Sequence, residues 1–179
     1  MTWSVEQFDA LPEERAAEAL RACCGAAKWV SGMLGRRPFR TRQAALEAAD
    51  DAWGELEPGD WLEAFTHHPR IGERRAANPS VAPESRVWSA AEQSGASAAA
   101  ADVATALAEG NRAYETRFGF IFIICATGLT ADSMLATLQR RLRNDGESEL
   151  RVAAEEHRKI TRLRLEKLLT PTMADARSQ

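Results

Sequence analysis

The chain has 179 residues and a formal net charge of −3. Hydrophobic residues make up 45% of it and charged residues 27%, which is typical of a folded globular protein and excludes a disordered one. The slight acidic excess argues against a basic surface for nucleic acid, and no apolar stretch approaches the roughly 18 residues that cross a bilayer. We therefore expect neither a nucleic-acid nor a membrane partner.

Three cysteines, Cys23, Cys24 and Cys125, give an odd number without C-x-x-C spacing. This indicates neither a disulfide framework nor a zinc site. The N-terminus lacks the basic segment and apolar run of a signal peptide, and the last residues lack a peroxisomal S-K-L address. We expect a cytoplasmic protein.

Helical patterns dominate the chain, and the predicted helices cover about 12–24, 26–34, 42–56, 60–68, 89–116, 131–143 and 147–169. Thr41 and Thr130 are expected to cap the helices that follow them. Asp60 is expected to cap the next, short helix. Pro69 is expected to end that helix, because the residue before a proline is pushed out of the α region. His68 is thereby predicted at the C-terminal edge of that helix.

The apolar run 118–126 follows the long helix, and Gly119 interrupts the pattern there. Periodicity alone cannot separate a buried strand from a buried helix in so short a run. Because the chain offers no second convincing strand, we predict a buried helical or irregular segment. The predicted fold is all-α, a single-domain multi-helix bundle over 1–170, with a frayed tail at 171–179; a polar loop is predicted at 73–87.

The candidate chemistry centres on His67 and His68, two of only three histidines in the chain. Adjacent helical residues point about 100° apart, so the pair is poorly placed to bind one metal ion. At the end of a helix the dipole favours the protonated imidazole, so His68 is suited to act as an acid or a base. A lone histidine is nevertheless more often structural, and that alternative stays open here.

A second element is Ser89-Ala90-Ala91-Glu92-Gln93. A capping box explains Ser89 and Glu92 without any function. The same helix N-terminus, with its backbone N–H groups and polar side chains, can also hold an anionic or ureide-like ligand. Both interpretations are kept.

The third element is the glycine-flanked run from Arg117 to Gly128. Most of it must be core, yet its main chain can approach a flat, amide-rich molecule. Cys125 within it is interpreted as a small buried hydrophobe and not as a nucleophile. In the last helix, Arg162 and Arg164 lie about 200° apart, so they cannot both face one pocket.

Three stretches, in this order, resemble the OHCU decarboxylase family, whose members decarboxylate 2-oxo-4-hydroxy-4-carboxy-5-ureidoimidazoline in the last step of urate breakdown to (S)-allantoin. They are His68-Pro69-Arg70-Ile71-Gly72, Trp88 to Gly95 and Asn111 to Ala126. The resemblance continues through 138–144 and 160–169, so it covers nearly the whole chain. Ile121 departs from the proline that many members have at this position, a change expected to be neutral.

The resemblance implies a helical homodimer that needs no metal and no organic cofactor. It implies that His68 and Glu92 are catalytic. The residues that it implies for substrate binding are Pro69, Ser89, Gln93, Ile123, Ile124, Cys125, Ala126 and Arg164. Its substrate is a small ureidoimidazoline, and its reaction is that of a carboxy-lyase in purine degradation.

Two alternatives belong to other classes. A non-catalytic helical protein-interaction module would account for the capping box, the alanine-rich helix and the basic last helix equally well. A metal-dependent hydrolase is disfavoured because His157 lies far along the chain and no ligand spacing is recognisable.

Overall fold

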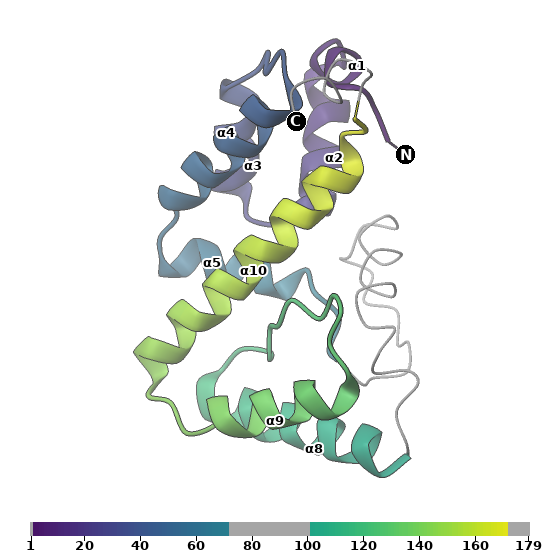
Figure 1. Ribbon diagram of the computed structural model, residues 1–179. Coiled ribbons are helices and arrows are strands. Elements are labelled where there is room, and N and C mark those ends of the chain that lie inside the picture. The colour runs from purple at the N-terminus through teal and green to yellow at the C-terminus, as the bar shows by residue number, and fades with distance from the viewer. Residues whose placement is uncertain (1, 72–100, 172–179) are drawn as a thin grey trace. The chain divides into compact units, whose positions relative to one another are not determined.

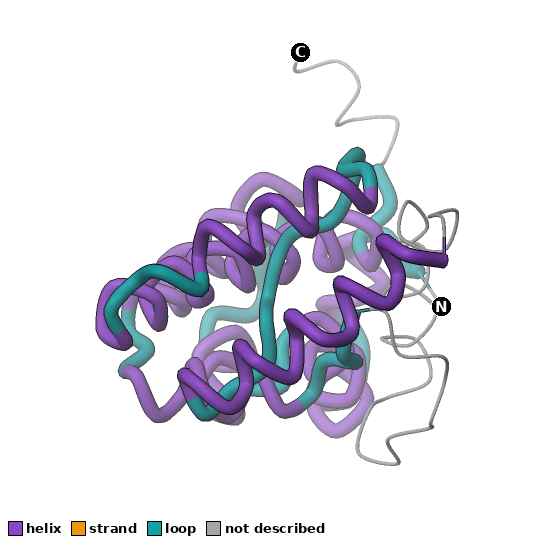
Figure 2. Tube along the Cα trace, turned by 90° about the horizontal axis from the view of Figure 1, so that it is seen from below, coloured by secondary structure: helices purple, strands orange, loops and turns teal. Residues whose placement is uncertain are grey.

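The computed structural model describes residues 2–71 and 101–171, and all regular structure in them is helical (Figure 2). The helices are α1 (Val5–Asp9), α2 (Glu13–Cys23), α3 (Ala27–Gly35), α4 (Arg42–Gly54), α5 (Pro58–Thr66), α8 (Ala101–Phe118), α9 (Ala131–Arg141) and α10 (Gly146–Leu168). The prediction of an all-α fold is confirmed. The chain divides into two compact units, one made of residues 1–64 and 158–179 and the other of residues 65–157.

The first unit contains α1 to α4, most of α5 and the second half of α10 (Figure 1). Its centre is aromatic and aliphatic: Trp29, Phe8 and Leu20 are fully buried, and the Trp29 indole donates to the Ala49 carbonyl at 3.1 Å. Burial of such large side chains removes apolar surface from water, and this removal drives folding. Thr41 caps α4 as predicted, because its hydroxyl accepts from the Ala44 N–H at 3.1 Å.

The two ends of this unit are joined by backbone hydrogen bonds. The Trp3 N–H donates to the Leu168 carbonyl, and the Thr170 N–H donates to the Trp3 carbonyl, both at 2.9 Å. Arg42 adds a side-chain bond, since its Nε donates to the Leu169 carbonyl at 3.0 Å. The Arg42 guanidinium thus provides a hydrogen-bond donor to carbonyl groups at the end of α10, which have no donor partner within the helix.

The second unit is built around α8 and α9, which lie side by side (Figure 1). A Cβ atom added at Gly110 of α8 would stand 2.5 Å from Leu138 Cδ2 of α9, so a glycine here lets the two helices approach closely. Leu107 and Tyr114 of α8 are fully buried, as is Leu138. Thr130 caps α9 as predicted, accepting from the Ser133 N–H at 3.2 Å.

Three local features differ from the sequence interpretation or complete it. Helix α1 was not predicted, although Ser4 and Gln7 form a capping box at its start. Helix α5 begins at Pro58 and not at Asp60, which instead accepts the Glu57 N–H at 2.9 Å; proline is favoured in the first turn because its missing N–H has no partner there. The run after Gly119 is irregular and not helical.

Some predictions lie outside the described residues. They are the polar loop at 73–87, most of the first half of the long helix predicted from residue 89, and the tail beyond Pro171. Whether residues 1–170 fold as a single domain stays a prediction.

Candidate active site

His68 lies two residues beyond the end of α5, in the bend that precedes Pro69. Its backbone N–H donates to the Phe65 carbonyl at 3.1 Å, which closes the last turn, and its side chain is half-buried. Because His68 follows the helix, the preceding turn does not restrict its ring as it would inside the helix. The sequence predicted His68 at the C-terminal edge of a helix over 60–68, and the structure ends this helix two residues earlier, at Thr66.

The segment that follows His68 is tied to α8 at two points. Arg70 forms a fork with Glu115, with Nε–Oε2 and Nη2–Oε1 distances of 2.9 and 2.7 Å. The buried Asn111 amide donates to the Ile71 carbonyl at 2.7 Å. The hydrogen bonds from Arg70 lower the pKa of Glu115, so this carboxylate stays charged in the tether. The backbone on the C-terminal side of His68 is therefore anchored.

His157 of α10 meets His68, which the sequence interpretation missed. The two ring centroids are 4.6 Å apart with an interplanar angle of 67°, an edge-to-face arrangement. His157 is fully buried, and Phe65 lies 5.7 Å from it, centroid to centroid. The available signal was a histidine on the buried face of a helix, between Ala153 or Ala154 and Ile160.

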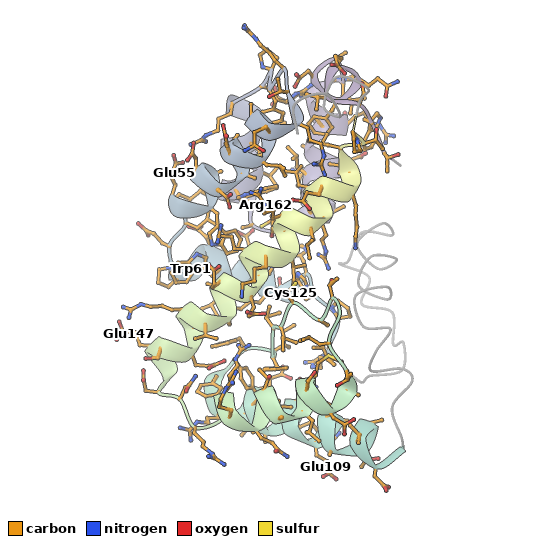
Figure 3. All side chains as sticks on the ribbon, in the orientation of Figure 1. Glu55, Trp61, Glu109, Cys125, Glu147 and Arg162 are labelled. Carbon is orange, nitrogen blue, oxygen red and sulfur yellow. The ribbon has the colours of Figure 1, made fainter. Side chains whose placement is uncertain are left out.

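The irregular segment 119–130 joins α8 to α9 and carries Cys125 (Figure 3). Gly119 and Gly128 bound it with φ values of +77° and +78°, in the left-handed region that favours glycine. Ile123, Ile124 and Ala126 are buried, and Cys125 is half-buried. Within the segment, the glycines provide the turns and the isoleucines provide the anchorage.

Two side chains fix the main chain of this segment. Arg141 Nη1 donates to the Ile123 carbonyl at 2.7 Å, and the Cys125 N–H donates to Glu156 Oε2 at 2.8 Å. A main chain with charged partners on both sides of Ile124 is held in one conformation. One carbonyl and one amide of the predicted substrate-binding stretch are therefore already engaged within the protein.

Arg141 is itself held by a buried polar network. Its Nη2 lies 2.6 Å from Glu149 Oε1, and both side chains are almost wholly buried. The Tyr114 hydroxyl donates to the same carboxylate oxygen, while the Asn144 amide donates to Glu149 Oε2 at 2.7 Å. The guanidinium also lies over the Phe122 ring, 4.7 Å from its centroid. Burial raises the pKa of Tyr114, so its hydroxyl stays a donor in this network.

Arg164 belongs to the first unit and is 1% exposed, whereas Arg162 is half-buried and pairs with Asp50 at 2.7 Å. The prediction that these two arginines face different surroundings is confirmed. Arg164 lies near Cys24, and burial raises the pKa of that thiol from 9.0 to about 12 despite the neighbouring guanidinium. Cys24 is thus an inert core residue at neutral pH.

The predicted Ser89, Glu92 and Gln93 lie outside the described residues, so the structure gives no position for them. Within 2–71 and 101–171, no group of three or more His, Cys, Asp or Glu side chains could hold a metal ion. No helix among the described residues is long and apolar enough to cross a membrane. Within the second unit, the described part of the candidate site consists of His68, its tether and the segment 119–130.

The described residues thus define a helical protein that combines an anchored histidine beside a proline with a clamped main-chain segment bounded by two glycines. The model of the family described as OHCU decarboxylase matches residues 9–166. The chain therefore belongs to the OHCU decarboxylase family, which confirms the resemblance.

Two relatives of known name agree with this assignment. The chain is 40% identical over 151 residues to the uric acid degradation bifunctional protein TTL of Arabidopsis thaliana, covering 84% of this chain and 46% of that protein. The chain thus spans about half the length of that relative. It is 33% identical over 134 residues to the 2-oxo-4-hydroxy-4-carboxy-5-ureidoimidazoline decarboxylase of Amia calva, covering 74% of this chain and 75% of that one.

Solved structures share the fold. One, a crystal structure of OHCU decarboxylase in the presence of (S)-allantoin, superposes with a TM-score of 0.73 at 38% identity and covers 86% of this chain and 99% of that one. A crystal structure of (S)-allantoin synthase superposes with a TM-score of 0.68 at 19% identity, covering 93% of this chain and 54% of that one. The second likeness concerns the fold alone.

Proposed function

We propose that this chain decarboxylates 2-oxo-4-hydroxy-4-carboxy-5-ureidoimidazoline to (S)-allantoin and CO2, as a step of urate degradation. The observation that carries the proposal is the family match over residues 9–166, which includes every predicted site residue from His68 to Arg164. The anchored position of His68 adds geometric support, because a proton-transfer group must be held in place to act.

The reaction breaks the bond between a ring carbon and its carboxylate. The substrate carries a hydroxyl group on the same carbon, and the electron pair left by CO2 passes into the adjoining ring system. The hydroxyl group loses its proton and becomes a ring carbonyl, while the neighbouring carbon, which carries the ureido group, is protonated on one face, so that allantoin of a single hand forms. Because the substrate's own ring accepts the electrons, we propose that no organic cofactor and no metal ion take part.

We infer that His68, oriented by Glu92, removes the hydroxyl proton or otherwise handles the proton transfer that accompanies loss of CO2. A positioned acid–base group of this kind supplies about 10²–10⁴-fold in rate. The tether from Arg70 and Ile71 to α8 supports this role, since it fixes the backbone next to His68. The contribution of Glu92 is a proposal from the family alone.

Substrate binding is proposed for Pro69, Ser89, Gln93, Arg164 and the main chain of Ile123, Ile124, Cys125 and Ala126. Arg141 and Glu156 already hold the Ile123 carbonyl and the Cys125 amide. The ring and ureido amides would therefore meet other main-chain groups of this segment, in a conformation that those two side chains have set. Such pre-positioning favours both rate and a single product hand.

We further propose that the protein is a cytoplasmic homodimer, as the family resemblance implies. Sedimentation equilibrium of the purified chain tests the oligomeric state. A mass near twice 19.7 kDa is expected, and a mass of one chain would contradict the dimer.

The test of the function uses freshly prepared substrate, because the compound also decays without enzyme. We expect circular dichroism to show optically active allantoin appearing faster than the spontaneous rate, both with and without a chelator. Loss of activity with the chelator would indicate a metal-dependent enzyme. No acceleration in either case would instead favour a non-catalytic helical interaction module.

A further inference from the structure

We propose that His157 is a positioning residue, whose buried ring holds the imidazole of His68 in the orientation that proton transfer needs. The inference rests on the proposed role of His68. It concerns a residue 89 positions further along the chain, on α10, that meets His68 only in the folded second unit.

His68 needs such support because of its place in the chain. It lies beyond the last turn of α5 in a bend, and it is only half-buried. The contacts of Arg70 and Ile71 with α8 fix the backbone, whereas the rotation of the His68 side chain depends on contacts of the ring itself, among them the one with His157. An imidazole that samples several rotamers presents its nitrogen to the reacting carbon for only part of the time.

His157 is suited to supply this support because it cannot move easily. Its ring is fully buried and lies 5.7 Å from the ring of Phe65, centroid to centroid. Phe65 in turn lies 5.5 Å from Phe120, and Phe120 lies 5.7 Å from Tyr114. His157 therefore lies at the end of a packed aromatic cluster, and its ring contacts His68.

The contact is a ring contact, and its geometry sets the expected effect. The centroids are 4.6 Å apart at 67°, within the range in which edge-to-face ring pairs attract. The attraction of such a pair corresponds to a change of about two- to twelvefold in the population of the held orientation. Loss of the ring at position 157 should lower kcat by roughly that factor.

The first test detects the ring contact in the wild-type protein. The chain has three histidines, so protein labelled only at histidine gives three sets of ring signals. His67→Asn and His68→Asn variants assign them. We expect a nuclear Overhauser cross-peak between the ring protons of His68 and His157 in the wild-type protein. The absence of this cross-peak would overturn the inference whatever the enzyme activity.

The second test separates the ring from its nitrogens. His157→Phe keeps a ring at this position, and His157→Leu removes it. We expect kcat to fall about tenfold in His157→Leu with KM changed less than about twofold, and to stay within about threefold of wild type in His157→Phe. Equal losses in the two variants, or no loss in either, would refute a positioning role for the ring.

Met134→Ala is the matched control for simple destabilisation. Met134 is fully buried in α9 of the same unit, so its truncation also weakens the packing of that unit. We expect a lower Tm but wild-type kcat at a temperature where the variant is folded. A tenfold loss of kcat here would show that His157→Leu reports only on stability. If His68→Asn kept full activity, the proposed role of His68 would fail, while the cross-peak would still report on the ring contact.

Discussion

The buried carboxylate of Glu149 offers a sharp test of how the segment 119–130 is held. Glu149→Gln keeps the shape of the side chain but removes the charge that balances Arg141, and both side chains are almost wholly buried. Breaking a buried ion pair from one side costs about 3–5 kcal/mol, because the remaining charge is left without compensation. In a chain of this size that corresponds to a fall in Tm of about 10 °C.

Glu147→Gln is the matched control on the same helix (Figure 3). Glu147 pairs with Arg151 one turn away, and both side chains are largely exposed. An exposed pair of this kind contributes about 0.3–0.5 kcal/mol, so Tm should fall by no more than about 2 °C. Thermal unfolding followed by far-ultraviolet circular dichroism compares the two variants. Equal Tm values for Glu149→Gln and Glu147→Gln would refute the reasoning that the buried network holds this unit together.

Further predictions concern Cys24, Arg70 and Tyr114. Burial raises the pKa of the Cys24 thiol from 9.0 to about 12. The neutral buried thiol therefore contributes its full share to the stability of the folded protein below pH 9, and this contribution is lost as the pH rises toward 12. Urea unfolding should show a slope of about 1.4 kcal/mol per pH unit above pH 9 that Cys24→Ala removes; an unchanged slope would contradict this. Arg70→Gln should lower the free energy of unfolding by less than about 1 kcal/mol, since the ion pair of Arg70 with Glu115 is partly exposed. The same variant should lower kcat about tenfold, because the backbone beside His68 loses this anchor. Wild-type kinetics would show that the tether does not support the site. Tyr114→Phe should lower the free energy of unfolding by about 1.5–3 kcal/mol in urea titrations, because Glu149 loses a buried donor, and a neutral effect would count against the network.

Most of the helices could be predicted because their boundaries depend on interactions between residues that are close in the sequence. Thr41 and Thr130 cap the helices after them, and Pro69 follows the end of α5, each through a short-range steric or hydrogen-bonding rule. The start of α5 was placed two residues late because Pro58 serves as a first-turn residue as well as a helix breaker. The run after Gly119 was left open because a short apolar stretch has no decisive period.

The contacts within the site could not be predicted in the same way. The pairings of His68 with His157, of Ile123 with Arg141 and of Cys125 with Glu156 join residues that are 18 to 89 positions apart. Hydropathy and spacing carry no information on which distant residues meet. The sequence does hold a weaker sign, since Arg141, Glu149 and His157 are polar residues at positions that the helical pattern buries.

The proposed reaction depends most on His68 as the proton-transfer group, and replacing each of the adjacent histidines tests this role directly. We expect His68→Asn to abolish enzymatic formation of (S)-allantoin while its circular dichroism spectrum stays helical, and His67→Asn to convert the substrate at close to the wild-type rate. Turnover by His68→Asn above about a tenth of wild type would contradict the proposed mechanism, because loss of a positioned acid–base group costs about 10²–10⁴-fold.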